Sequence, residues 1–283
     1  MARPLRLPAD LSPSQVISLQ DALLANADKL LRAALTMLEN DNVALARSLA
    51  ILGMEESGKA IALHERRVHM AYAPEGEPFV DERLQKLWGL HGRKLEIVHG
   101  FLIREDYWFG VEAGDPEENA RVLGTIEAWK LDHNVLKQRG FYVDVTPAGE
   151  PATPAEVADG DSVRDVIGYV HQIGWQLRLG EHIEGRARLE REREIPPATE
   201  AEIESMRSMM KRVEPAIVER ILSSMRQGTE GEGLNNAAYA FTLPESPFEN
   251  IGRPGYEAQD RELQVIAEET SSTASEAPTG TTD

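Results

Sequence analysis

The chain contains no cysteine among its 283 residues. Disulfide bridges, zinc sites with thiolate ligands and a cysteine nucleophile are therefore excluded, and such a composition suits a reducing cytosol. No uncharged apolar run approaches the roughly 18 residues that a membrane span needs, and the opening MARPLRLPADLSPSQ lacks the apolar centre of a signal peptide. These absences predict a cytoplasmic protein that has no membrane partner.

Positive charge is also scarce. Lysine and arginine number 30 against 48 aspartates and glutamates, which gives a net charge of −18. Eleven acidic residues stand against two arginines between Thr229 and Asp283. No large basic surface is expected, which argues against DNA binding, although a local cleft could still bind phosphate. Because the final stretch ETSSTASEAPTGTTD is poor in apolar residues, residues 229–283 are predicted to be an acidic, largely disordered tail, disordered beyond about Glu268.

The sequence motifs of several enzyme classes are missing as well. There is no Walker loop, GxGxxG, HExxH or GxSxG, so ATP use, nicotinamide chemistry, and zincin or α/β-hydrolase catalysis have no support. A ferritin-like dimetal site would need two Glu-x-x-His units on bundle helices, and the chain offers only Glu96 with His99. We expect neither a cofactor nor a bound metal.

Apolar residues with helical spacing dominate what is present. The pattern predicts helices at 13–39, 43–71, 80–104, 117–139, 162–194 and 199–227. Residues 140–157 alone are strand-like, and their glycines and prolines favour an extended arm or a short hairpin. The predicted class is all-α, a helical bundle with a short extended insertion and additional C-terminal helices. The expected domains are the bundle at 10–145, a helical extension at 146–228 that packs on it, and the tail at 229–283.

The helix predicted at 43–71 carries charge where a core helix should not. In GMEESGKAIALHE, Glu55 and Lys59 have the spacing of a surface ion pair. However, Glu56 falls near the middle of an apolar arc, Lys59 lies just inside its edge, and the opposite side is also largely apolar. The helix is therefore predicted to be central, and Glu56 needs partners because a buried carboxylate is costly unless it is paired.

The helix predicted at 80–104 breaks its pattern in the same way. His91 falls within its apolar stripe and Lys94 lies at the margin, while Arg93 and Glu96 point away. A single histidine on an apolar face is most often a structural core residue, but two helices share this anomaly. We therefore expect these helices to be neighbours, with Glu56 and His91 pointing into the same space.

The order of these residues resembles the AbiV family of abortive-infection proteins, which belongs to the HEPN superfamily of helical domains. The matching pieces are Asn26 with Ala27, the EExGK of residues 55 to 59, the HxxK of His91 and Lys94, and the GFYVD of residues 140 to 144. Together they span residues 20 to 145. The resemblance implies a four-helix HEPN core, a tendency to dimerise and a role in bacterial defence against phage.

Many HEPN proteins are metal-independent endoribonucleases that use an arginine and a histidine separated by four to six intervening residues. Here Arg93 with His99 and Arg164 with His171 have that spacing, but chance alone predicts nearly as many pairs. Arg164 and His171 share a helix face, with Arg178 two turns further on. The EExGK and HxxK residues differ from the usual nuclease pair, so the ribonuclease activity is left open.

Two hypotheses remain for the function. The first is a defence effector that cleaves or binds RNA, or acts on translation, through Glu55, Glu56, Lys59, His91 and Lys94, with Arg164 and His171 as weaker candidates. Such a site could be completed across a homodimer. The second is a non-enzymatic interaction module, in which the polar cluster only sets helix register and the C-terminal helices and acidic tail bind a phage or translation protein. A positive, open cleft at His91 would favour RNA, and a closed, paired cluster would favour the module.

Overall fold

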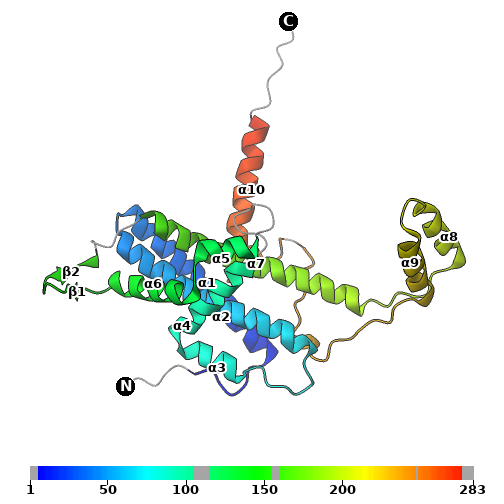
Figure 1. The fold of residues 1–283 in the computed structure, drawn as a ribbon, viewed down its shortest axis with the longest axis horizontal. Coiled ribbons are helices and arrows are strands. Elements are labelled where there is room, and N and C mark those ends of the chain that lie inside the picture. The colour runs from blue at the N-terminus through cyan, green and yellow to red at the C-terminus, as the bar shows by residue number, and fades with distance from the viewer. Residues whose placement is uncertain (1–5, 105–114, 155–159, 247, 276–283) are drawn as a thin grey trace, which may run out of the picture. The chain divides into compact units, whose positions relative to one another are not determined.

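The computed structural model describes residues 6–104, 115–154, 160–246 and 248–275. Over these residues it contains ten α-helices and one two-stranded sheet, so the predicted all-α class is confirmed (Figure 1). The chain forms two compact units: unit 1 comprises Met1–Arg67, Gly76–Gly180 and Pro244–Asp283, and unit 2 comprises Val68–Glu75 and Glu181–Leu243. These boundaries differ from the domain limits expected at 145 and 228, because two long helices run from one unit into the other.

The first two helices match the predicted ranges closely. Helix α1 spans Pro13–Glu39 and starts with a capping box between Ser12 and Gln15. Helix α2 spans Val43–Tyr72. A Cβ added to Gly53 of α2 would lie 3.3 Å from the Ala27 carbonyl oxygen of α1 and 3.4 Å from Val170 of α7 (Gly160–Glu192). Helix α2 is therefore packed on several sides, as its apolar circumference predicts.

Three of the predicted helices are each two helices in the structure. Their bounds are Glu82–Gly89 (α3) and His91–Arg104 (α4), Pro116–Leu123 (α5) and Ile126–Arg139 (α6), and Glu200–Met209 (α8) and Pro215–Gln227 (α9). Leu90 has an extended backbone between α3 and α4. Gly124 takes a φ of 74° between α5 and α6, where Thr125 caps the next helix. Pro215 begins α9 because proline suits a first helical position.

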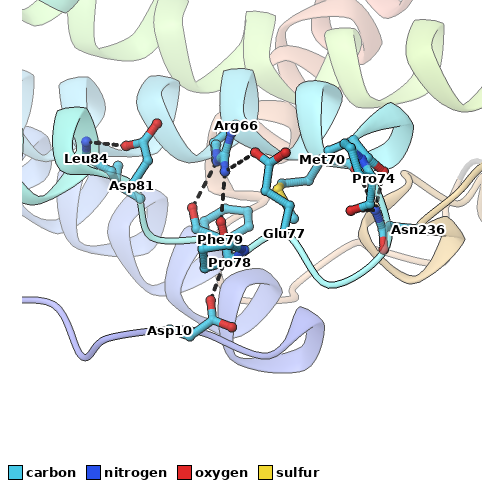
Figure 2. Close-up of polar contacts among 11 residues, drawn as sticks. Asp10, Arg66, Met70, Pro74, Glu77, Pro78, Phe79, Asp81, Leu84 and Asn236 are labelled. Carbon is cyan, nitrogen blue, oxygen red and sulfur yellow. Dashed lines mark hydrogen bonds and ion pairs between the residues drawn. The ribbon is translucent and has the colours of Figure 1, made fainter.

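The loop between α2 and α3 is held by Arg66 (Figure 2). Its guanidinium donates to the carbonyl oxygens of Phe79 and Pro78 at 2.9 and 2.8 Å, and to Glu77 at 2.8 Å. Asp81 then caps α3 by accepting from the Leu84 amide at 2.7 Å. These charge-assisted bonds set the position of α3 in unit 1.

The predicted insertion is a short hairpin. Strand β1 (Asp144–Val145) pairs antiparallel with β2 (Pro151–Ala152), which confirms the hairpin interpretation; the end of the predicted segment, 155–157, lies outside the described residues. Gly140 lies just before the hairpin and against α2, where an added Cβ would be 2.2 Å from the Ala44 carbonyl oxygen. Glycine is needed there for close approach of two backbones.

Unit 2 contains the ends of α2 and α7 together with α8 and α9. Asn236 caps the end of α2, since its side-chain amide donates to the carbonyl oxygens of Met70 and Ala73 at 3.1 and 2.7 Å (Figure 2). Helices α8 and α9 pack together through the fully buried Ile203 and Leu222. Part of the predicted helical extension, α8 and α9, therefore packs around a small hydrophobic core of its own.

The C-terminal residues differ from the predicted disordered tail. Helix α10 covers Glu257–Ser275, and its first turns pack on α1 and α7 within unit 1. Arg261 of α10 forms an ion pair with the buried Asp28 of α1, and Glu262 contacts His171 of α7 at 2.6 Å. Composition alone predicts disorder here because few residues are apolar, whereas charge-assisted bonds to groups on other helices stabilise the segment. Residues 276–283 lie outside the described residues.

Two truncations should therefore behave differently. Removing residues 269–283 should leave the thermal midpoint unchanged within error, because so polar a segment buries little. Removing residues 257–283 should destabilise unit 1 by on the order of 2 to 3 kcal/mol, the scale of hydrogen bonds between charged groups, since Asp28 loses Arg261. Calorimetry on both truncations measures this contrast, and equal midpoints would show that the α10 contacts contribute nothing.

Candidate functional site

The polar cluster of unit 1 is centred on Glu55 of α2. The Glu55 side chain is only 3% exposed, and it accepts from His91 Nδ1 at 2.5 Å through Oε2. Its other carboxylate oxygen, Oε1, accepts from the Nζ of Lys137 on α6. Lys94 Nζ of α4 lies 3.9 Å from Oε2. One buried carboxylate thus joins three helices, which meets the requirement that a buried charge be paired and hydrogen-bonded.

Glu55 is held in its ionised form. Burial alone would raise its pKa, but the hydrogen bonds and positive charges of Lys137 and His91 outweigh burial, so the pKa of Glu55 is lowered. The pKa of Lys94 is also lowered, first by burial and then by the charge of Lys59, against the opposing charges of Glu55 and Glu56. The site therefore combines an anionic centre with a lysine whose charged form is disfavoured.

His91 does not lie where its apolar stripe predicts. Its side chain is 61% exposed, because the chain is extended at Leu90 and a new helix starts at His91. A carboxylate can only accept a hydrogen bond, so Nδ1 of His91 carries the proton toward Glu55 and Nε2 of the neutral ring is an acceptor. His91 is therefore an exposed imidazole fixed by a buried carboxylate, and not the core histidine that an apolar stripe most often indicates.

Glu56 and Lys59 form a second, adjacent pair. Lys59 Nζ donates to Glu56 at 2.6 Å, with the two side chains 14% and 19% exposed. The Lys59 ammonium also lies 5.3 Å from the ring centroid of Trp88 on α3, a cation–π contact. The glutamate that contacts His91 is Glu55 and not Glu56, and that Glu56 shares a space with His91 stays a prediction. Helical periodicity assigned the buried position to the wrong one of two neighbouring glutamates.

The glycine of EExGK has a packing role. A Cβ on Gly58 would lie 2.5 Å from the Lys94 carbonyl oxygen, so only glycine lets α4 approach α2 this closely. Ser48 of α2 donates to the carbonyl oxygen of Lys137 on α6 at 2.7 Å. This hydrogen bond lies near Gly140, where the backbone comes close to that of α2. The two glycines thus let α4 and α6 bring Lys94 and Lys137 to Glu55.

Replacing Gly58 with alanine should test this packing. Overpacking costs about 1–3 kcal/mol, which exceeds the gain of up to about 1 kcal/mol from better helix propensity. Gly100→Ala on α4 is the matched control, because its added Cβ would meet only the Arg104 guanidinium at 4.0 Å. Denaturant titrations should show a loss for Gly58→Ala and no loss for the control. Equal stability of both variants would mean that α4 moves away from α2 without cost.

Lys137 is the site residue that the sequence-based prediction missed. It lies four and eight residues after His133 and Trp129, on one stripe of α6. Trp129 and Lys137 are buried and His133 is half-buried, with its ring 4.1 Å from that of Trp129. A lysine that shares a helix stripe with a tryptophan interrupts a core-facing side, as Lys94 of the HxxK does, and this pattern could have identified Lys137 as a site residue.

The two arginine–histidine pairs do not join this cluster. Arg164 is exposed, whereas His171 is half-buried and contacts Glu262 and Arg261 of α10. The pKa of His171 is lowered to about 4, mainly by burial and then by the Arg261 charge. In the other pair, Arg93 binds Glu96, while the buried His99 contacts the Gly124 carbonyl oxygen at 3.0 Å. Each of these histidines thus has a structural contact with another helix or loop.

Within the described part of the chain, no three His, Asp or Glu side chains come together as metal ligands would. Nor does any described helix combine the length and the apolar character needed to cross a membrane.

Comparison with known proteins finds a matching family. The family model of the AbiV proteins, a HEPN family, matches residues 15–175. No curated protein and no solved structure matches the chain. The matched range covers more than half of the 283 residues and contains Glu55, His91, Lys94 and Lys137. The chain therefore belongs to the AbiV family of HEPN proteins.

Proposed function

We propose that the protein defends bacteria against phage by abortive infection, and that it acts on RNA through His91. Membership of the AbiV family indicates the defence role. The observation that supports the chemistry is the contact between His91 and Glu55, in which a buried, ionised carboxylate orients an exposed imidazole. A histidine held in this way at Nδ1 is suited to accept a proton at Nε2.

The reaction that fits this group is cleavage of RNA by its own 2′-hydroxyl. His91 Nε2 takes the 2′-hydroxyl proton, and the 2′-oxygen attacks the adjacent phosphorus. The bond from phosphorus to the 5′-oxygen breaks, and the leaving oxygen takes a proton from an acid. The products are a 2′,3′-cyclic phosphate and a 5′-hydroxyl. Glu55 stabilises the imidazolium that forms, and the lysines around it keep Glu55 ionised.

A homodimer would supply the missing acid. Glu55 contacts a single imidazole within one chain, among the described residues, while the reaction needs both a base and an acid. Two copies of His91 brought to one phosphate by a two-fold axis would provide both, one neutral and one protonated. The partner implied by the proposal is therefore a second copy of this chain, with RNA as the substrate.

The proposal is tested on RNA from infected cells. Cells that express the wild-type chain should accumulate RNA fragments with 2′,3′-cyclic phosphate ends after infection, and cells with His91→Gln should not, because glutamine can donate to Glu55 but cannot act as a base. His182→Ala on α7, a histidine outside the cluster, is the control and should behave as wild type. Cyclic-phosphate ends that persist in His91→Gln would contradict the assignment.

A second candidate function, a protein-interaction module, is favoured by two observations. Glu55, Lys94 and Lys137 are closed and paired, which suits a structural cluster. Helices α8 and α9 and the turn between them also leave apolar side chains exposed, namely Met209, Val213, Ile217 and Ile221. Exposed apolar residues that gather on one short segment are typical of interaction surfaces.

The two functions predict opposite outcomes for matched variants. If the module is correct, Ile217→Asp with Ile221→Asp should abolish phage protection, while His91→Gln retains it. If RNA chemistry is correct, His91→Gln should abolish protection. Both isoleucines are 37% exposed, so the paired change should leave unit 2 folded, which circular dichroism can check.

A further inference from the structure

A cleft of about 550 Å³ lies between α2, α3 and α4, within unit 1. Its apolar part is formed by Leu87 of α3 and Ile97 of α4. Its charged part comes from four cationic side chains and three glutamates. Along α4 the lining residues Arg93, Gly100 and Arg104 recur at helical spacing, and neither Lys94 nor any other residue that contacts Glu55 belongs to the lining. The cleft is therefore separate from the Glu55 cluster.

The carboxylates of the cleft do not balance its cations. Glu65 is shared by two guanidiniums, those of Arg104 at 3.3 Å and Arg83 at 3.6 Å. Glu96 is also shared, by Arg93 and by Lys130 of α6, each at 2.6 Å.

The third glutamate is paired one to one. Glu82 binds Lys86 at 2.6 Å. The lining thus has four cations and three carboxylates, and one of these carboxylates, Glu96, also pairs with Lys130 from outside the lining. The cleft therefore carries an excess of one positive charge in a chain whose net charge is −18. Such a local excess attracts anions.

Gly100 supplies an independent indication that the space is used. It lies inside α4, where glycine costs about 1 kcal/mol relative to alanine. Packing does not require glycine there, because an added Cβ would meet only the Arg104 side chain at 4.0 Å. At Gly58, by contrast, the backbone of α4 leaves no room for a Cβ. The absent side chain at Gly100 keeps the cleft open.

We infer that this cleft binds a nucleoside phosphate. An arginine guanidinium can donate two parallel hydrogen bonds to the oxygens of one phosphate, and it can also stack on the flat face of a base. Leu87 and Ile97 provide an apolar surface for that base, and the volume falls in the range of small-ligand sites. The same group could come from a free nucleotide or from one nucleotide of an RNA strand. The inference does not depend on the chemistry proposed for His91.

Binding is measured on the full-length protein by calorimetric titration with three probes: ADP, inorganic pyrophosphate and a ten-residue oligouridylate. ADP should bind, and more tightly than pyrophosphate, because only ADP can contact the apolar surface. Gly100→Met fills the cleft, and Arg104→Gln removes one cation. Each should weaken ADP binding by about ten-fold or more, the scale of one lost charge-assisted hydrogen bond.

Arg121→Gln is the matched control for Arg104→Gln, because Arg121 is exposed and lies outside the lining. It should bind ADP within about two-fold of wild type. Gly100→Met should melt at or above the wild-type midpoint, since methionine improves helix propensity. If Gly100→Met fails to fold, Arg104→Gln carries the test alone, because that side chain is exposed.

The outcomes separate the possible ligands. Oligouridylate that binds in competition with ADP, and is lost in Gly100→Met, would identify RNA as the source of the nucleotide and support the inference. Pyrophosphate that binds as tightly as ADP would overturn the nucleoside part. No binding of any probe, or binding unaffected by both Gly100→Met and Arg104→Gln, would overturn the site. None of these results bears on the RNA ends produced through His91.

Discussion

Glu55→Gln should lower the free energy of unfolding by about 3–5 kcal/mol, because it leaves buried lysines without a counter-charge. Lys137 and Lys94 both lie within the cluster, with side chains 9% and 8% exposed. Glutamine has nearly the volume of glutamate, so the loss reports charge and not packing. Chemical denaturation at neutral pH measures it.

Two controls make this result specific. Glu118→Gln removes an exposed glutamate from an ion pair with Arg121 and should leave the free energy of unfolding nearly unchanged, because solvent screens such pairs. The double variant Glu55→Gln with Lys137→Met should cost less than the sum of the two single changes, because the second change removes the stranded charge. Strict additivity would show that these two side chains are not coupled.

The effect of Glu55 should also depend on pH. Its pKa is lower in the folded state than the ordinary 4.5, since Lys137 and His91 outweigh the effect of burial. The stabilisation is therefore present above pH 4.5 and is lost as the pH falls through the lower folded value. The difference between wild type and Glu55→Gln should shrink steadily below pH 4.5. A difference that grows on acidification would mean that burial dominates the pKa.

Phage protection should fall to the level of cells that do not express the protein when His91 is replaced with alanine. General acid–base catalysis by a positioned side chain contributes about 10²- to 10⁴-fold, so its loss leaves too little activity to stop an infection. The stability cost should be small, about 1 kcal/mol, because His91 is 61% exposed and Glu55 keeps its two lysines. Plating efficiency and a melting curve, measured on the same variant, test both statements.

His182→Ala should keep full protection in the same assay, which controls for expression and for loss of a histidine. A His91→Ala variant that is as stable as wild type and fully protective would remove His91 from the mechanism and favour the interaction module. A variant that loses both stability and protection would show that His91 matters mainly for folding. The two measurements thus separate a chemical role from a structural one.

Most of the helices followed from local sequence signals. Apolar spacing and the Ser12 capping box predict α1 and α2 closely, because local hydrogen bonds and one-sided burial determine where such helices begin and end. The breaks at Leu90 and Gly124 were not predicted. In both places the apolar pattern continues across the break, so periodicity alone does not detect the change of direction.

The sequence by itself determined the all-α class, the central position of α2 and the motif residues of the cluster, since these depend on residue type and spacing along one helix. Only the tertiary structure decided which glutamate is buried. Glu55 and Glu56 are successive residues that point in different directions around α2, and it is Glu55 that faces its partners on α4 and α6. The tertiary structure likewise brought in Lys137, 82 residues from Glu55 along the chain, and placed α10 against α1. Contacts between distant residues depend on how helices pack, and a local pattern contains no information about that packing.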